Sequence, residues 1–279
     1  MGKTNTRREP CAERVGSALD KESGDADNKG REGQSLLHYV LYCRKYTERI
    51  YLMAFQVTYL HHSGFTVELA HDFLVFDWDG TQPPPRVPEG KRTIVFISHR
   101  HGDHCSPLAF DLVRRTPGAL LLCGRGVPRR GVASTVRFSE PFEAEGLTVR
   151  ALRSTDEGAA FLVRTADACL YHAGDLNWWH WEGEPDPWNP DMEKRYRAEI
   201  ETLRGERIDL AFVPVDPRLG EAYVLGLDCF MRTAGASHVF PMHCWDDPTV
   251  GERLQADPAT EPYRERIVFL SRPGERWEG

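Results

Sequence analysis

The segment FISHRHGDHC, residues 96–105, carries His99, His101, Asp103 and His104 within six positions. The whole chain has only 11 histidines among 279 residues, so this density is far above the chain average. Neutral imidazole and carboxylate groups are the ligands that zinc favours at catalytic sites, where one position stays open for water. Histidines at positions i and i+2 can face one metal, and the following Asp–His pair can face a second point nearby. The segment therefore predicts a metal site.

The elements around this segment must place it at the end of a strand. Residues 93–97 are an apolar run typical of a buried strand, and residues 106–115 have helical spacing, with Ser106 as N-cap and Pro107 at the first helical position. Side chains at strand ends converge on one crevice in such sheets. Further strands are expected at 57–60, 65–69, 73–77, 119–123, 148–152, 160–164, 169–172, 210–213, 238–241 and 267–270, and further helices at 191–204 and 222–233.

The order of these elements predicts an α+β fold. Strands come first as meanders and later alternate with helices, a pattern typical of two sheets packed face to face with helices outside. We place this domain at residues 53–279, because the strand pattern begins almost directly after Met53. Residues 1–52 are expected to be a disordered or poorly ordered extension, and Met53 is a candidate for the true start.

The composition narrows the class of protein. A net charge of −7 without a long basic run argues against a nucleic-acid partner and favours a small-molecule substrate. The seven cysteines are scattered and contain no CxxC, which favours a reduced, cytoplasmic chain. There is no apolar run of about 18 residues, so we expect no membrane span.

The chain resembles the metallo-β-lactamase superfamily over about residues 55–272. The H-x-H-x-D-H signature stands at residues 99–104, and YLHHSGFTVE (59–68) is similar to the first hairpin of the ascorbate-6-phosphate lactonase-like branch. By this resemblance, Asp77 in FDWD braces the metal-ligand loop, Asp175 in YHAGDLNWW is the bridging carboxylate, and His243 in FPMHCW is the last metal ligand. The fold that the resemblance implies is a four-layer αββα sandwich.

The same resemblance leaves the first of two metal sites one ligand short. The superfamily has a further histidine in the region that reads ALRSTDEGAAF here (151–161), and Arg153 stands where it belongs. Either Asp156 supplies a carboxylate oxygen instead, or the protein works with one ion. Arg153 either pairs with a surface acid or holds an anionic substrate. The ligands present are His99, His101 and Asp175 for the first site, and Asp103, His104, Asp175 and His243 for the second.

These ligands imply a metal-dependent hydrolase. A bound divalent ion lowers the pKa of its water toward neutrality and polarises the oxygen under attack. We expect one or two Zn²⁺ ions, with Mn²⁺ or iron as alternatives, and a small ester, lactone or phosphoester as substrate. Flavodiiron oxidoreductases of the superfamily would have an acid in place of His101, which favours hydrolysis over redox chemistry. A nuclease of the same superfamily and a non-catalytic metal-binding or sensing protein are the alternatives.

Residues 178–188, WWHWEGEPDPW, hold four of the seven tryptophans and predict a wall or lid beside the metals. The alternative is that these rings only seal the edge of the core. Two residues are candidates for catalytic roles, Asp103 to orient the attacking water and His180 to donate a proton. Other residues expected near the substrate or behind the ligands are His62, Asp77, Arg153, Asn177 and Trp178.

Overall fold

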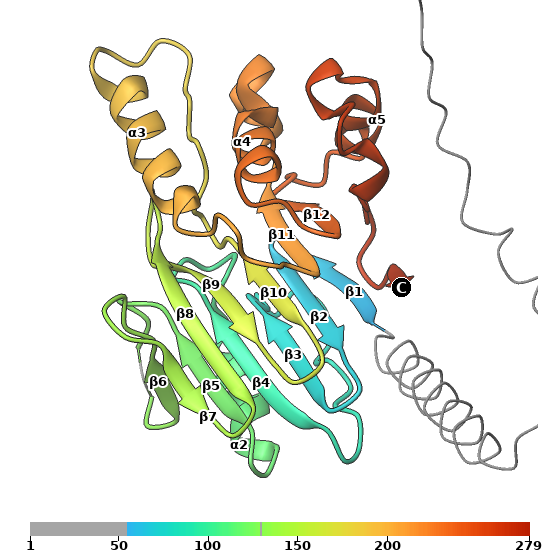
Figure 1. Cartoon of the computed structure of the whole chain (residues 1–279). Coiled ribbons are helices and arrows are strands. Elements are labelled where there is room, and N and C mark those ends of the chain that lie inside the picture. The colour runs from blue at the N-terminus through green and yellow to red at the C-terminus, as the bar shows by residue number, and fades with distance from the viewer. Residues whose placement is uncertain (1–54, 129) are drawn as a thin grey trace, which may run out of the picture. The chain divides into compact units, whose positions relative to one another are not determined.

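The computed structural model describes residues 55–128 and 130–279. The predicted extension at residues 1–52 and the candidate start at Met53 lie outside the described residues. In the described part the strands form two sheets (Figure 1). No helix among these residues is long and apolar enough to cross a membrane.

The first sheet has seven strands in the order β13-β1-β2-β3-β4-β5-β6. Its first part is antiparallel from β13 to β3, and the pairs from β3 to β6 are parallel. The carboxyl ends of β3 and β4 therefore lie at the same edge. The strands are β1 (Gln56–His61), β2 (Gly64–Glu68), β3 (Asp72–Phe76), β4 (Arg92–Ile97), β5 (Leu120–Cys123), β6 (Ala133–Thr135) and β13 (Arg276–Glu278).

The second sheet has six strands in the order β12-β11-β10-β9-β8-β7. Here β10, β11 and β12 are parallel, so their carboxyl ends also share one edge, and the remaining pairs are antiparallel. The strands are β7 (Phe142–Ala144), β8 (Leu147–Arg153), β9 (Ala159–Arg164), β10 (Cys169–His172), β11 (Leu210–Pro214) and β12 (His238–Met242).

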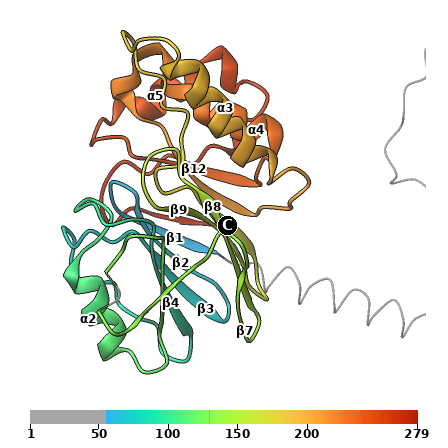
Figure 2. The same cartoon turned by 90° about the vertical axis from the view of Figure 1, so that its left-hand side faces the viewer.

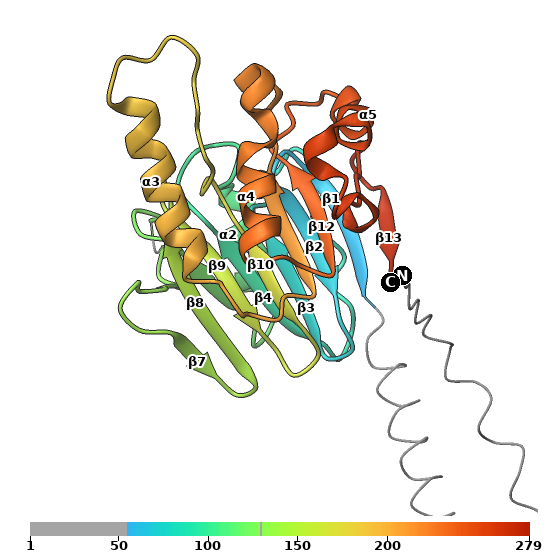
Figure 3. The same cartoon turned by 45° about the horizontal axis from the view of Figure 1, so that its top comes forward.

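Helices cover the outer faces of both sheets. Figure 2 shows α2 on one side of the paired sheets and α3, α4 and α5 on the other. Helix α3 lies against α4, which contacts β11 (Figure 3). The structure confirms the predicted αββα sandwich. The helices are α2 (Pro107–Arg115), α3 (Trp188–Glu201), α4 (Leu225–Thr233) and α5 (Thr249–Ala256), with short 3₁₀ turns η1 (Pro217–Val224), η2 (Pro258–Thr260) and η3 (Arg264–Arg266).

Side chains of β4 alternate between the core that separates the two sheets and the cluster that packs against α2. Successive residues of a strand point to opposite faces. Ile94 and Phe96 join the core between the sheets, whereas Val95 and Ile97 join the cluster that packs against α2. The Phe96 ring lies 5.4 Å from that of Phe161 on the opposite sheet, centroid to centroid. Packing on both faces holds the end of β4, and the loop after it, in a fixed position.

The expected last strand at residues 267–270 is wrong. Only Ile267 forms a bridge there, to Val239, and the final strand is β13 at Arg276–Glu278, which pairs with β1. Ile267 and Leu270 are both buried at the edge of the core. The apolar character of residues 267–270 therefore reflects core packing rather than strand pairing. A short apolar run does not by itself distinguish these two outcomes.

Candidate metal centre

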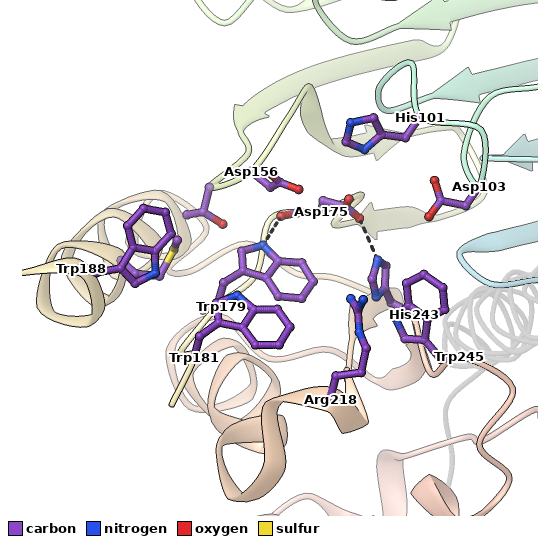
Figure 4. Close-up of a pocket in the computed structure, with 12 residues that line it drawn as sticks. His101, Asp103, Asp156, Asp175, Trp179, Trp181, Trp188, Arg218, His243 and Trp245 are labelled. Carbon is purple, nitrogen blue, oxygen red and sulfur yellow. Dashed lines mark hydrogen bonds and ion pairs between the residues drawn. The ribbon is translucent and has the colours of Figure 1, made fainter. Parts of the chain in front are cut away.

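The candidate ligands lie just after strand ends at the shared edge of the two sheets (Figure 4). His99 follows β4, Asp175 follows β10 and His243 follows β12, while Asp77 follows β3 behind them. Ligand sites of sheets with parallel strands lie at the carboxyl ends of those strands. The four motifs, which are far apart in the sequence, therefore meet in one place.

Sharp turns aim these residues inward. His62, Asp77 and His243 have φ values of 53°, 39° and 62°, a left-handed conformation that few non-glycine residues adopt. Gly174, with φ of 50°, lies so close to Ser98 that a Cβ atom there would be 2.7 Å from the Ser98 Cβ. Glycine at this position therefore lets the Asp175 loop reach the His99 loop across the two sheets.

Asp175 lies at the centre of the cluster. Its Oδ2 atom is 3.3 Å from His99 Nε2, and its Oδ1 atom is 3.3 Å from His104 Nε2 and 3.6 Å from His243 Nε2. Four ligands placed tetrahedrally about 2.0–2.1 Å from a zinc ion would lie ~3.4 Å apart. The observed separations match that spacing, so Asp175 and these histidines could together hold a divalent ion.

Buried atoms without partners give an independent test of the fit to a metal. His62 Nε2, His104 Nε2 and Asp175 Oδ1 are all buried and make no hydrogen bond to any described residue. Burying such atoms unpaired costs free energy. His104 Nε2 lies 3.3 Å from Asp175 Oδ1, and His104 and His62 belong to one group of potential ligand atoms. The residues therefore fit divalent ions, which would satisfy the unpaired atoms.

His62 joins the second site directly. Donor atoms of His62, Asp103, His104 and His243 all lie within 4.8 Å of one another, and His62 Nε2 is 3.5 Å from Asp103 Oδ2. The sequence had placed His62 only near the substrate or behind the ligands. These four donors form one group, in which His62 stands beside the expected Asp103, His104 and His243.

The first site gathers the residues expected for it, together with Asp156. Potential ligand atoms of His101, Asp156 and Asp175 form one group, and those of His99, His101 and Asp103 form another. His101 is largely exposed, and its Nδ1 atom lies 2.9 Å from His99 Nε2. The geometry favours the hypothesis that Asp156 replaces the absent histidine, because the carboxylate reaches the same cluster.

Comparison with known proteins supports the fold described above. Residues 56–180 match the family model described as the β-lactamase superfamily domain. The chain has the metallo-β-lactamase fold. A search of curated protein sequences found no significant match.

Solved structures show the same fold at low identity. Igni18, a metallo hydrolase from the archaeon Ignicoccus hospitalis, is 19% identical with a TM-score of 0.56, and the match covers 81% of this chain and 98% of that one. The metallo-β-lactamase fold protein YhfI from Bacillus subtilis is 14% identical with a TM-score of 0.52, covering 81% and 99%. CmlA from Streptomyces venezuelae, a diiron β-hydroxylase, is 12% identical with a TM-score of 0.53, covering 81% of this chain and 54% of that one. The fold thus occurs with both hydrolase and oxidative chemistry.

Two buried carboxylates orient histidines of this metallo-β-lactamase fold. Asp77 Oδ2 accepts a hydrogen bond from His104 Nδ1 at 2.8 Å, as expected for the bracing acid, and Asp216 Oδ2 lies 3.1 Å from His243 Nδ1. Such partners fix the ring and direct its other nitrogen at the metal. Sequence reasoning missed Asp216. Its signal was an acid directly after the apolar strand in AFVPVD (211–216), as Asp77 follows LVF (74–76).

The surroundings lower the pKa of His62 and His99 but raise that of His104. Burial, with His243 and His104 nearby, lowers the pKa of His62 to about 3, and burial beside His104 lowers that of His99 to about 3. Burial acts in the same direction on His104, but Asp175 and Asp77 outweigh it and raise its pKa to about 9. An ion that binds through His104 Nε2 must therefore displace a proton.

A pocket of about 260 Å³ opens onto the metal cluster. Its floor is formed by acidic and histidine residues of the cluster, and its walls are aromatic (Figure 4). The wall residues are Trp179, Trp181, Trp188, Met192, Arg218 and Trp245. The predicted tryptophan segment thus contributes three of the wall residues, whereas Arg218 and Trp245 had not been identified from the sequence.

Trp178, Asn177, His180 and Arg153, which were expected near the substrate or in catalysis, do not line this pocket. Trp178 packs against α3, where the Arg197 guanidinium lies over its ring at 4.6 Å. Asn177 is buried and its backbone bonds to Thr155. His180 and Arg153 also lie outside the wall, and the Arg153 guanidinium lies over the Phe138 ring at 5.3 Å. The structure therefore does not bring Arg153 to the first metal site.

Proposed function

We propose that this protein is a cytoplasmic metal-dependent hydrolase that acts on a small ester, lactone or phosphoester. The proposed cofactor is zinc, in one or two ions, with manganese or iron as alternatives. The opening YLHHSGFTVE motif supports placement near the ascorbate-6-phosphate lactonase-like branch of the superfamily. Small molecules, rather than nucleic acids, are the proposed substrates because the pocket is small and the chain is acidic.

One observation carries the proposal. Buried donor atoms of His62, His104 and Asp175 make no hydrogen bond to any described residue, and Asp175 lines a pocket. His104 Nε2 and Asp175 Oδ1 are 3.3 Å apart, a separation that matches two ligands of one zinc ion. A metal cluster at the base of an open pocket is suited to chemistry on a bound molecule, whereas a structural metal site is closed.

The ligands divide the chemical work. When bound, a divalent ion lowers the pKa of a water molecule and polarises the oxygen under attack. Asp103 is partly buried beside His62 and lines the pocket, and its pKa is held low by His104 and His62 despite burial. It therefore stays a carboxylate that can accept a hydrogen bond from the attacking water. The tryptophan walls exclude other water from the substrate.

The test is a hydrolysis panel on protein with known metal content. Purified protein should contain zinc, manganese or iron by elemental analysis and should hydrolyse at least one member of a panel of aryl esters, lactones and phosphodiesters. His104→Ala should lose both metal and activity. His71→Ala, at an exposed histidine bonded to Asp167, is the matched control and should keep both. Full turnover by metal-free protein would contradict the proposal.

A non-catalytic metal-binding or sensing role is the second candidate. It is favoured by the absence of the usual third histidine from the first site, where the exposed Asp156 stands instead. Tight binding of one ion with no hydrolysis across the panel would support this role over the enzyme. Salt-dependent RNA binding would instead support the nuclease alternative.

A further inference from the structure

Arg218 is the one lysine or arginine among the residues that line the described pocket. It follows β11 by a few residues and is held by Asp216, which is fully buried. The Arg218 Nε atom donates to both Asp216 oxygens at 3.0 and 3.1 Å, and Nη2 donates to Oδ2 at 2.6 Å. A forked pair of this kind fixes the plane of a guanidinium group. The position of the Arg218 charge is therefore set before any ligand binds.

Two tryptophans support the same guanidinium. The Arg218 Cζ atom lies 4.2 Å from the Trp245 ring centroid and 5.6 Å from that of Trp181. Figure 4 shows Arg218 standing between these two rings, beside His243. The Nη1 nitrogen makes no hydrogen bond to any residue in the described part, and the side chain is 47% exposed. Two N–H groups thus remain free at the pocket.

The rest of the wall is apolar. Trp179 and Trp181 stack with an interplanar angle of 6°, and Met192 and Trp188 continue the surface. A cavity of roughly 150 Å³ is enough for a benzene ring, so the observed 260 Å³ leaves room for a ring and one small charged group. The pocket therefore combines a place for a planar group with a single fixed cation.

We propose that this pocket selects substrates that carry an anionic group, a carboxylate or a phosphate, beside a planar or ring-shaped apolar group. Arg218 binds the anion through Nη1, and the tryptophans pack on the ring. The inference rests on the proposed hydrolase function and assigns its substrate class. It makes Arg218 a specificity-determining residue next to the metal ligands, in the role that the sequence had considered for Arg153.

The competing explanation is that Arg218 only positions Asp216 and, through it, His243. Asp216 keeps two other partners in the absence of Arg218, because its Oδ2 atom also lies 3.1 Å from both His243 Nδ1 and Trp245 Nε1. We therefore expect the loss of Arg218 to leave metal affinity unchanged, whereas a purely positioning role would lower it and would weaken charged and neutral ligands alike. A role in anion binding would weaken only the charged ones.

The test measures ligand binding rather than turnover. Zinc-loaded wild type and Arg218→Gln are titrated with benzoate, phenyl phosphate and the neutral benzyl alcohol, followed by tryptophan fluorescence and calorimetry. We expect the Kd values of the two anions to rise on the order of tenfold in Arg218→Gln, since a hydrogen bond to a charged group contributes about 1.5 kcal/mol or more. The Kd of benzyl alcohol and the zinc affinity should stay unchanged. Comparing benzoate with phenyl phosphate distinguishes carboxylate from phosphate substrates.

Arg253→Gln is the matched control. Arg253 also stacks on an aromatic ring, that of Tyr223 at 4.0 Å, but lies outside the pocket. It should leave all four affinities unchanged. Equal loss of anion and alcohol binding in Arg218→Gln, a fall in zinc affinity with it, or undiminished anion binding would each overturn the inference. Since binding is measured without turnover, these outcomes are independent of the hydrolysis panel, whose failure would instead reject the proposed function.

Discussion

Replacement of His62 by asparagine tests whether this residue is a metal ligand. Asparagine is the appropriate substitution because His62 has a φ of 53°, which asparagine tolerates better than most residues. Its side chain is too short to place an atom where Nε2 stands. The main-chain bond from His243 N to His62 O should survive, so the loop between them keeps its position.

The expected loss follows from the number of donors. Zinc bound by four protein ligands is stabilised by about 10–16 kcal/mol. Shared over four ligands, this is ~2.5–4 kcal/mol for each, or about 70- to 900-fold in Kd. The pKa of His62 is lowered to about 3 by burial and neighbouring histidines, so the ring is neutral at pH 7 and gives up no proton when it binds. The loss should therefore be the same at pH 7 and pH 8.

Competition with a chromogenic chelator measures the zinc affinity. His61→Asn is the matched control, because His61 is the adjacent residue but bonds to Asp79 at 2.7 Å and belongs to none of the candidate ligand groups. The free energy of unfolding of the metal-free protein should change little in His62→Asn, since His62 Nε2 has no hydrogen bond to lose. Unchanged zinc affinity in His62→Asn would refute the assignment of His62 as a ligand.

Three further predictions concern the surroundings of the cluster. Asp77→Asn should weaken zinc binding about 10- to 100-fold, because Asp77 orients His104, and chelator competition checks this. Zinc uptake at pH 7 should release about one proton, since the pKa of His104 is about 9. Zinc affinity should then rise with pH and level off above pH 9. Calorimetry in buffers of different ionisation enthalpy counts the released proton. Asp156→Ala should reduce the metal content from two ions to one by native mass spectrometry, and retention of two would show that Asp156 is not a ligand.

Much of the fold follows from patterns within a few residues of each other. The alternation in 93–97 predicts a buried strand, and the helix after it begins at Pro107 with Ser106 accepting a hydrogen bond from Leu108 N, as its N-cap role requires. Asp175 lies three residues after the end of β10, and His243 directly follows β12. Residues this close to a strand end have little freedom to lie elsewhere. Local spacing is sufficient for such positions.

Other site residues depend on geometry that no local pattern contains. His61 and His62 are adjacent, and which of them faces the metals depends on an irregularity in the β1–β2 register and on the left-handed turn at His62. Arg218 looks like a turn residue in VDPRLG (215–220), and its role emerges only where β11 places Asp216 beside His243. Trp245 is likewise a lone aromatic until the loop after β12 brings it over Arg218.

The two metal sites also differ in the kind of donor they offer. At the second site, His62, His104 and His243 supply three imidazoles. The proposed first site has two, His99 and His101, and an oxygen of exposed Asp156 lies where it could take the place of a third histidine. Imidazole suits zinc, whereas carboxylate-rich sites suit harder ions such as manganese. We therefore propose that the second site, which is more buried and richer in nitrogen, binds zinc more tightly than the first.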